Sequence, residues 1–214
     1  MRWFLDMCVI LYSAGEGDRP DLNKKTKKFV EQKGGDDFLL CYYIKEVDIP
    51  KYLERQQIIL GEIIKKINND SYALYPSQKA SKLTGRDKKK LIKLLLLSKT
   101  IGNTEEKIKS LIKLFSELER RINHFLQKYI DGFVVPLGEI DFELKSCLFT
   151  WLAPNNSDSK IIASAIQEHN KQRLKIITAD KKDWTGDLLR EVHNNFKLKK
   201  KYSELPKISY IQEM

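Results

Sequence analysis

The sequence is poor in cysteine and histidine, the residues on which disulfide frameworks and zinc sites depend. It has three of each in 214 residues. Cys8, Cys41 and Cys147 form no C-x-x-C pair and stand among apolar neighbours, so we expect buried thiols in a reducing compartment. The histidines are scattered along the chain without the spacing of metal ligands, which argues against a zinc site.

Long apolar runs are also missing. No stretch of the chain has the length that a membrane-spanning helix needs. The N-terminus is apolar, but Asp6 interrupts it after five residues, which is not the pattern of a secretory signal peptide. We therefore expect a cytoplasmic protein without a membrane partner.

Acidic residues are fewer than basic ones, 29 against 39, and the formal net charge is +10. Such a balance favours a polyanionic partner such as nucleic acid, although a Lys-rich solvated surface has the same composition. The charge is concentrated in one segment. Residues 76–130 contain 14 Lys and Arg against 5 Asp and Glu, a net charge of +9.

Apolar and amphipathic stretches alternate along most of the chain, which predicts an α/β fold. Expected strands cover residues 3–5, 38–49, 133–137, 174–178 and 208–211, and expected helices cover 50–67, 142–152, 158–170 and 185–194. Alternating strands and helices indicate a mostly parallel central sheet covered on both faces, a three-layer arrangement. With 214 residues the chain suffices for one core with an added subdomain.

Two segments depart from this alternation. Residues 15–37 are polar and rich in Lys, so we expect a loop with a short helix around 25–32. Residues 71–130 predict two long antiparallel helices with basic outer faces, a helical hairpin inserted into a single domain of residues 1–214. Leu94–Leu97 is apolar on all sides, and either the partner helix or a second copy of the chain would bury it. The sequence therefore leaves open whether the chain forms a homodimer.

Carboxylates follow the apolar runs at several points. Asp6 and Asp180 stand where buried strands end, and the carboxyl ends of parallel strands meet at one edge of a sheet. Asp158 begins a helix and shares a face with Ile161, Ile162 and Ala165. Each acid alone has an ordinary structural interpretation, as a helix-terminal or turn residue. Together they repel one another unless Mg²⁺ or Mn²⁺ neutralises them.

Three stretches resemble the PIN-domain family of nucleases. FLDMCVILY is similar to the family's first strand with its leading Asp, here Asp6. VVPLGEIDFELKSCLFTWL followed by SDSKIIASAI is similar to the segment that delivers a later acid, here Asp158. LKIITADKKDW is similar to the closing strand and its Thr-x-Asp turn, and it is the most specific of the three. The resemblance covers roughly residues 1–68 and 132–214, and Cys8 stands where the family often has Asn.

The resemblance implies a PIN-like three-layer fold and metal-dependent hydrolysis of RNA, or of structured DNA, with Mg²⁺ or Mn²⁺ as cofactor. It implies Asp6, Glu54, Asp158 and Asp180 as catalytic residues, with Glu46 as the alternative to Glu54. The implied metal ligands are Asp6, Asp158, Asp180 and Asp183, and Thr178 would hydrogen-bond a neighbouring carboxylate. The resemblance also leaves open whether an inhibitory partner protein binds this chain.

The helical insertion is the expected site of phosphate contacts. Its candidate residues are Arg86, Lys88, Lys89, Lys90, Arg120 and Arg121. For each of these side chains a solvated helical face is an equally good interpretation. The basic run Lys197–Lys201 is either a second contact of this kind or a polar linker.

Two other functions compete with a nuclease. The first is a nucleic-acid-binding module with a degenerate PIN site, which metal binding at the acidic residues would distinguish. The second is a metal-dependent phosphatase or a receiver-like domain, which also places Asp at strand ends. A phosphatase of the haloacid type needs a D-x-D at the first strand, and Asp6-Met7-Cys8 lacks the second Asp.

Overall fold

The computed structural model describes residues 1–16, 19–76, 78–152 and 155–214. Contacts within the chain define two compact units, residues 1–49 with 122–214 and residues 50–121. The first contains a five-stranded sheet and is α/β, as the sequence predicts, whereas the second consists of helices. Among the described residues, no helix combines the length and the apolarity that crossing a membrane requires.

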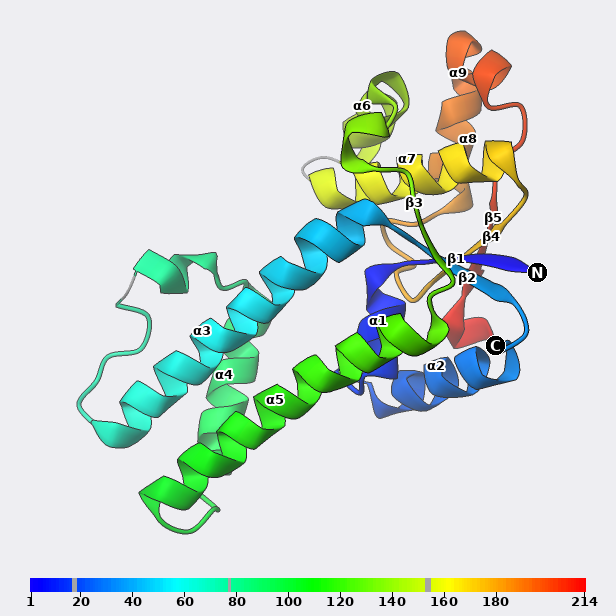
Figure 1. Ribbon diagram of the computed structural model, residues 1–214. Coiled ribbons are helices and arrows are strands. Elements are labelled where there is room, and N and C mark those ends of the chain that lie inside the picture. The colour runs from blue at the N-terminus through cyan, green and yellow to red at the C-terminus, as the bar shows by residue number, and fades with distance from the viewer. Residues whose placement is uncertain (17–18, 77, 153–154) are drawn as a thin grey trace. The chain divides into compact units, whose positions relative to one another are not determined.

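The sheet of the first unit is parallel throughout, with the strand order β3-β2-β1-β4-β5 (Figure 1). Its strands are β1 (Arg2–Leu5), β2 (Asp37–Cys41), β3 (Gly132–Val134), β4 (Lys175–Thr178) and β5 (Lys207–Tyr210). The middle strands are short apolar runs that are buried on both sides, which is usual for parallel sheets covered by helices. All five predicted strands are present.

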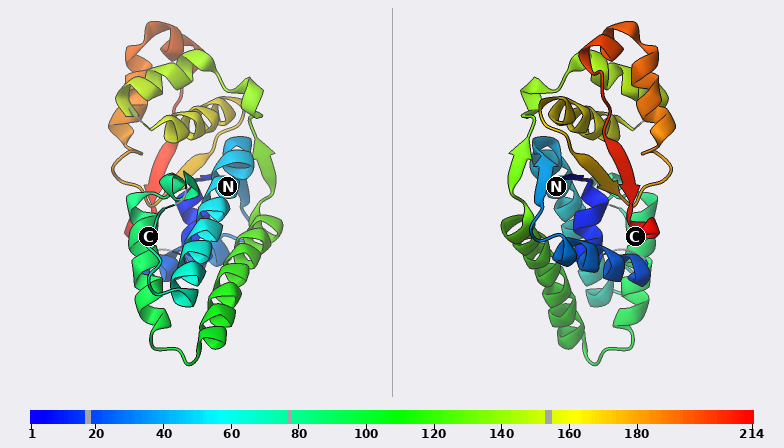
Figure 2. Two further views of the ribbon diagram at one scale, coloured as in Figure 1. Left: turned by 90° about the vertical axis from the view of Figure 1, so that its left-hand side faces the viewer. Right: turned by 90° about the vertical axis from the view of Figure 1, so that its right-hand side faces the viewer.

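The helices of the first unit are α1 (Met7–Ser13), α2 (Pro20–Gln32), α6 (Phe142–Leu152), α7 (Asn156–Lys171), α8 (Gly186–Asn194) and α9 (Phe196–Lys201). Short 3₁₀ turns cover Leu137–Glu139 and Ile211–Glu213. Figures 1 and 2 show α1 and α2 on one face of the sheet and α7 on the other. The face of α7 that carries Ile161, Ile162 and Ala165 is buried, as its spacing predicts.

The expectation of a strand over residues 38–49 is wrong in its second half. The strand ends at Cys41, the chain is helical from Tyr42, and a π-helical turn, η1, covers Ile44–Asp48. The neighbouring strands β1 and β3 end at Leu5 and Val134. A longer β2 would have no partner for its backbone groups, so the chain turns helical in spite of its aromatic and β-branched residues.

Residues 15–37 are also more helical than expected. The helix α2 begins at Pro20 rather than near residue 25, because proline is well suited to the first helical position, where no backbone donor is needed. Leu22, Phe29 and Val30 give this helix a buried face against the sheet unit. Gly17 and Asp18, which belong to the loop expected here, lie outside the described residues.

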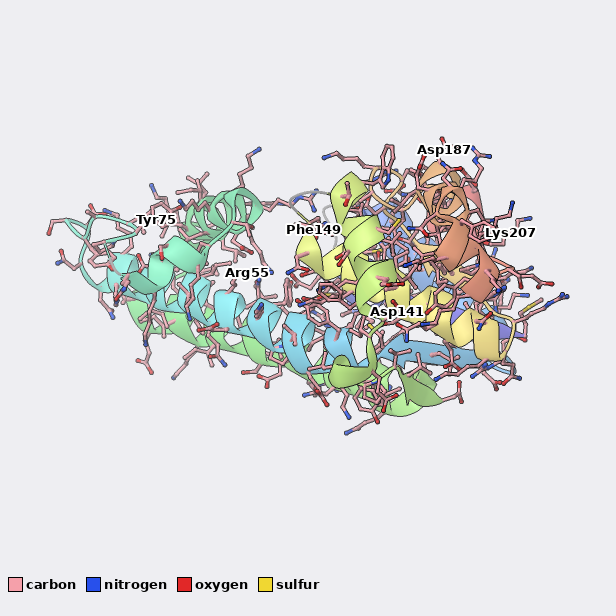
Figure 3. All side chains as sticks on the ribbon, turned by 90° about the horizontal axis from the view of Figure 1, so that it is seen from above. Arg55, Tyr75, Asp141, Phe149, Asp187 and Lys207 are labelled. Atoms are coloured by element: carbon pink, nitrogen blue, oxygen red, sulfur yellow. The ribbon has the colours of Figure 1, made fainter. Side chains whose placement is uncertain are left out.

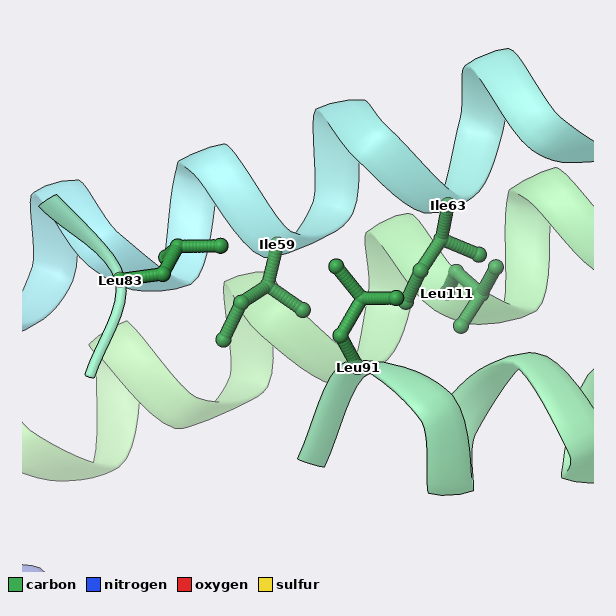
Figure 4. Close-up of a cluster of buried hydrophobic side chains, with 5 residues drawn as sticks. All are labelled: Ile59, Ile63, Leu83, Leu91 and Leu111. Carbon is green, nitrogen blue, oxygen red and sulfur yellow. The ribbon is translucent and has the colours of Figure 1, made fainter. Parts of the chain in front are cut away.

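The second unit is built from α3 (Ile49–Asn68), α4 (Gly85–Ser98) and α5 (Thr104–Tyr129), with a 3₁₀ turn over Gln78–Lys82. The ends of α3 and α5 continue into the first unit. Ile59 and Ile63 from α3, Leu91 from α4 and Leu111 from α5 pack together with Leu83 (Figure 4).

Polar contacts join α3 and α4 within this unit. Thr84 and Asp87 form a capping box at the start of α4, and the Nε of Arg55 lies 3.0 Å from Asp87 Oδ2. The helical insertion was expected over residues 71–130, whereas the compact helical unit spans 50–121. It includes α3 because the buried isoleucines of that helix complete the apolar cluster.

Replacing Leu91 with Ala is expected to lower the free energy of unfolding by about 2–5 kcal/mol, because the side chain is fully buried and leaves a cavity. Urea denaturation followed by circular dichroism measures this change. Leu96→Ala is the matched control on the same helix, since Leu96 is 57% exposed, and its effect should stay within about 0.5 kcal/mol. Equal effects of the two substitutions would contradict the packing of α4.

Candidate metal centre

The candidate site lies at the edge of the sheet where the parallel strands end. Asp6 follows β1 directly, and Asp180 stands two residues after the end of β4. The two strands are adjacent, with Leu5 paired to Ile177, and the backbone N–H of Asp6 donates to the carbonyl of Ile177 at 3.1 Å. The topology thus brings together acids that are 174 positions apart in the sequence.

Asp6 is almost fully buried, with 5% of its surface exposed. The hydroxyl of Thr178 donates to Asp6 Oδ2 at 2.7 Å, and the Cys8 thiol donates to the same oxygen at 2.8 Å. The Thr178 hydroxyl oxygen also accepts the backbone N–H of Asp180 at 2.9 Å. Thr178 therefore has the supporting contact that the PIN resemblance implies, and it links the positions of the two acids.

The pKa of Asp6 is raised above its ordinary value. Burial is the main cause, and the negative charge of Asp180 adds to it. The hydrogen bonds from Cys8 and Thr178 act in the opposite direction, because they stabilise the charged carboxylate. A cation close to Asp6 would remove the cost of this buried charge.

Cys8 has a supporting role that the sequence alone did not reveal. Its sulfur accepts the backbone N–H of Ala179 at 3.1 Å while its thiol donates to Asp6. Burial and the nearby charge of Asp6 raise the pKa of Cys8 well above its ordinary value, so the thiol stays protonated and remains a donor. The one available signal was its position two residues after Asp6, where the PIN family often has Asn.

The turn after β4 is held by Asp180 itself. Its Oδ1 accepts the backbone N–H groups of Lys182 at 2.8 Å and of Asp183 at 3.1 Å. This is the local hydrogen bonding that lets an Asp side chain close a turn on its own backbone. It fixes Asp183 on the same side as Asp180, so the spacing of three residues brings both carboxylates to one place.

Asp158 lies in the first turn of α7. The residue that caps this helix is Asn155, whose side-chain oxygen accepts the Asp158 N–H at 3.3 Å. The Asn155 amide also donates to the carboxylates of Asp158 and Asp183, at 3.3 Å for the latter. The indole N–H of Trp184 donates to Asp158 Oδ1 at 3.3 Å. Both donors come from residues that the sequence analysis did not assign to the site.

Asp158, Asp180 and Asp183 form a compact group, in which one oxygen of each lies within 4.8 Å of those of the other two. Burial, as the largest cause, and the charges of Asp6, Asp180 and Asp183 together raise the pKa of Asp158 to about 7, while the hydrogen bond from Trp184 acts in the opposite direction. The negative charges of these carboxylates therefore repel one another. Asp6 acts on the group through its charge but is not one of the three.

The donor set of this group fits a hard divalent cation. The three acids of the group, and Asp6 beside them, offer only oxygen, which suits Mg²⁺ or Mn²⁺ better than zinc. Within the described part of the chain, no Lys, Arg or His forms an ion pair with Asp6, Asp158, Asp180 or Asp183. Their charge is thus not balanced by the described side chains.

The second acid of the PIN resemblance has more than one candidate. Glu54 belongs to the helical unit and pairs with Lys82 at 2.5 Å, which lowers its pKa. Glu46 is an exposed residue of η1. Asp48 ends the same turn and is half-buried, and its charge, with that of Asp6, contributes to the raised pKa of Cys41, which burial chiefly causes. Asp48 is therefore a third candidate.

The six basic residues expected to contact phosphate all lie in the helical unit. Arg86, Lys89 and Arg120 are exposed and available. Lys88 is exposed and lies over the ring of Tyr75, 5.4 Å from its centroid. The ammonium of Lys90 donates to Gln56 Oε1 at 2.7 Å, so this lysine has a structural contact within the unit. Arg121 is half-buried.

The chain was compared with models of known protein families, with curated proteins and with solved structures. None of the three comparisons gives a match.

The raised pKa of Asp158 predicts a pH dependence of stability. In the folded state this acid keeps its proton up to a pH of about 7, compared with an ordinary pKa of 3.8. The folded state binds more protons in that interval, so in EDTA the free energy of unfolding should fall as the pH rises from about 4 to about 7. Asp158→Asn should flatten this decline.

Chemical denaturation at half-unit steps between pH 4.5 and pH 8 tests this expectation. The size of the effect is on the order of a few kcal/mol, because one pKa unit corresponds to about 1.4 kcal/mol. Asp187→Asn is a suitable control, since Asp187 is an exposed acid of the same unit that pairs with Arg190. If the stability of the Asp158→Asn protein fell with rising pH as steeply as that of the wild type, the raised pKa of Asp158 would be contradicted.

Proposed function

We propose that this protein is a divalent-metal-dependent endoribonuclease with a PIN-like site. The observation that carries the proposal is the convergence of Asp158, Asp180 and Asp183 beside the buried Asp6. These acids come from three separate parts of the chain and meet at the sheet edge where parallel α/β folds bind their ligands. A protein gains nothing in stability from such a group unless a cation joins it.

In the proposed site Asp158, Asp180 and Asp183 hold the metal, and Asp6 completes its surroundings. Thr178 and Cys8 keep one Asp6 oxygen in place through their hydrogen bonds. Bound Mg²⁺ or Mn²⁺ would supply an activated water and stabilise the leaving oxygen of a phosphodiester. Carboxylates alone suffice for this chemistry, so no His or Ser nucleophile is needed.

RNA as the substrate is supported by charge. The net charge of +10 favours a polyanion, and the exposed Arg86, Lys89 and Arg120 of the helical unit offer phosphate contacts. The resemblance to PIN nucleases points to RNA ahead of structured DNA. A cytoplasmic location and an inhibitory partner belong to the same proposal.

A nucleic-acid-binding module with a degenerate PIN site is the second candidate. The observation in its favour is that Glu54 pairs with Lys82 within the helical unit, so the charge of this acid is already balanced by a lysine. Such a module would bind RNA without metal and would not cut it. The cleavage experiment below separates the two functions.

The purified protein is expected to cut a mixed RNA pool with Mn²⁺ or Mg²⁺ and to be inactive in EDTA. Asp6→Asn and Asp180→Asn should each lower the rate by about 100-fold or more, because each removes a charge on which metal binding and water activation depend. Gel analysis of end-labelled RNA measures the rates. Asp187→Asn, an exposed acid of the same unit, should retain activity.

The same assay locates the second acid. The cleavage rates of three variants are compared: Glu54→Gln, Glu46→Gln and Asp48→Asn. The second acid is the residue whose replacement lowers the rate as much as Asp6→Asn does. Cutting that persists in Asp6→Asn and Asp180→Asn would show that a contaminant is responsible. A wild-type protein that binds RNA but leaves it intact with both metals would favour the binding module.

A further inference from the structure

The helix α6 exposes aromatic side chains that its packing does not use. Its buried face consists of Leu144, Leu148 and Leu152. Phe142 is 72% exposed and Phe149 is 38% exposed. They are seven residues apart, so they lie on one side of the helix, about 10 Å from each other along its axis. Figure 3 labels Phe149 near one end of α6 and Asp141, which precedes Phe142, at the other.

A lysine lies between the two aromatic residues. Lys145 is three residues after Phe142 and four before Phe149, and residues at these spacings are neighbours on a helix surface. Its ammonium lies 4.8 Å from the centroid of the Phe142 ring. Phe142, Lys145 and Phe149 thus form an alternating aromatic and cationic stripe, which we call the α6 stripe.

The short helix α9 adds further positive charge at the start of α6. The ammonium of Lys201 contacts the carboxylate of Asp141, and the hydroxyl of Tyr202 donates to the same oxygen at 2.8 Å. These contacts hold α9 against the end of α6 where Phe142 stands. The sequence of α9, FKLKKK, contains four lysines and no acid. One acid of α6, Glu143, lies beside Phe142 in the sequence.

We propose that the α6 stripe binds single-stranded RNA by stacking bases on Phe142 and Phe149, with Lys145 and the α9 lysines other than Lys201 at the phosphates. This inference rests on the proposed nuclease function and names where its substrate is bound. Exposed aromatic rings alternating with cations are the combination that binds single strands without sequence preference. The cations beside the exposed rings favour RNA, a polyanion, as the occupant.

The position of the stripe in the chain fits this role. At its C-terminal end α6 leads to α7, whose first turn carries Asp158. The two helices pack against each other within the sheet unit. RNA on the stripe would therefore be held by the same unit that contains the acidic group.

Fluorescence anisotropy with a labelled 12-nucleotide single-stranded RNA in EDTA tests this inference, because no cleavage occurs and no metal is needed. Phe142→Leu and Phe149→Leu keep an apolar side chain but remove the stacking ring. Each should raise the Kd by about fivefold or more, the lower end of what one stacked base contributes. Phe142→Tyr should bind as the wild type does.

Trp151→Leu is the matched control. Trp151 is 60% exposed and belongs to the same helix, but it stands nine residues after Phe142 and so lies about 180° around the helix from it. Its replacement should leave the Kd unchanged. An equal loss of affinity in Trp151→Leu and Phe142→Leu would overturn the inference, because the stripe would then not be distinct from the rest of the helix.

Two further measurements identify what is bound. Lys145→Gln should reduce the salt dependence of log Kd by about one, the signature of one lost phosphate contact. With an abasic oligomer of the same length, Phe142→Leu and Phe149→Leu should bind as tightly as the wild type. A stripe that bound anionic vesicles or a second copy of this chain in place of RNA would contradict the proposal.

The outcomes separate this inference from the proposed function. If the wild type cuts RNA with Mn²⁺ while both Phe→Leu variants bind RNA normally, the nuclease function is supported and RNA binding by the α6 stripe is refuted. If the variants lose binding in EDTA while no preparation cuts RNA, the stripe is an RNA-binding surface and the nuclease function fails.

Discussion

The hydrogen bond that Thr178 donates to the carboxylate of Asp6 joins the ends of two adjacent strands, and the Cys8 thiol donates a second bond to the same oxygen. They form at the edge of the sheet where β1 and β4 stop, and the Thr178 hydroxyl also accepts the N–H of Asp180. Because Thr178 contacts both acids, a shift of either strand would move the other carboxylate. The rest of the site depends on this connection, since Asp180 in turn orders Asp183 through the turn that it closes.

The cost of this arrangement is visible in the pKa of Asp158, which burial and three neighbouring carboxylates raise to about 7. Hydrogen bonds from Asn155 and Trp184 hold this acid in place but supply no positive charge. Sites that concentrate charge in this way lose stability for the sake of function, which is common where a ligand compensates. A divalent cation is the compensating partner that the oxygen-only donor set favours.

Much of the fold could be predicted because two neighbouring strands of its sheet are short apolar runs with an acid just after them. Trp3–Leu5 and Leu174–Thr178 show this pattern in the sequence, and their parallel pairing follows from the intervening helices. The end of β2 could not be predicted in the same way. It depends on where β1 and β3 stop, which no local property of residues 42–49 reveals.

The candidate site, like the fold, could be predicted only in part from the sequence. Asp6, Asp158, Asp180 and Asp183 could be named from their positions after strands and at the start of a helix. The role of Cys8 depends on the amide of Ala179, 171 residues away in the sequence, and so could be seen only in the folded chain. Asn155 and Ser157 are equally good capping residues by type, and the folded chain uses Asn155. Glu54 satisfied a sequence spacing, but its neighbour in space is Lys82.

The most direct test of the account is a calorimetric titration of the metal-free protein with Mn²⁺ near neutral pH, repeated with Asp158→Asn and Asp180→Asn. We expect saturable binding by the wild type with release of protons, because Asp158 must give up its proton to become a ligand. Both variants should bind much more weakly, while Asp187→Asn should bind as the wild type does. A metal centre at this sheet edge would be contradicted if the wild type did not bind Mn²⁺. It would also be contradicted if the wild type and all three variants bound Mn²⁺ equally well.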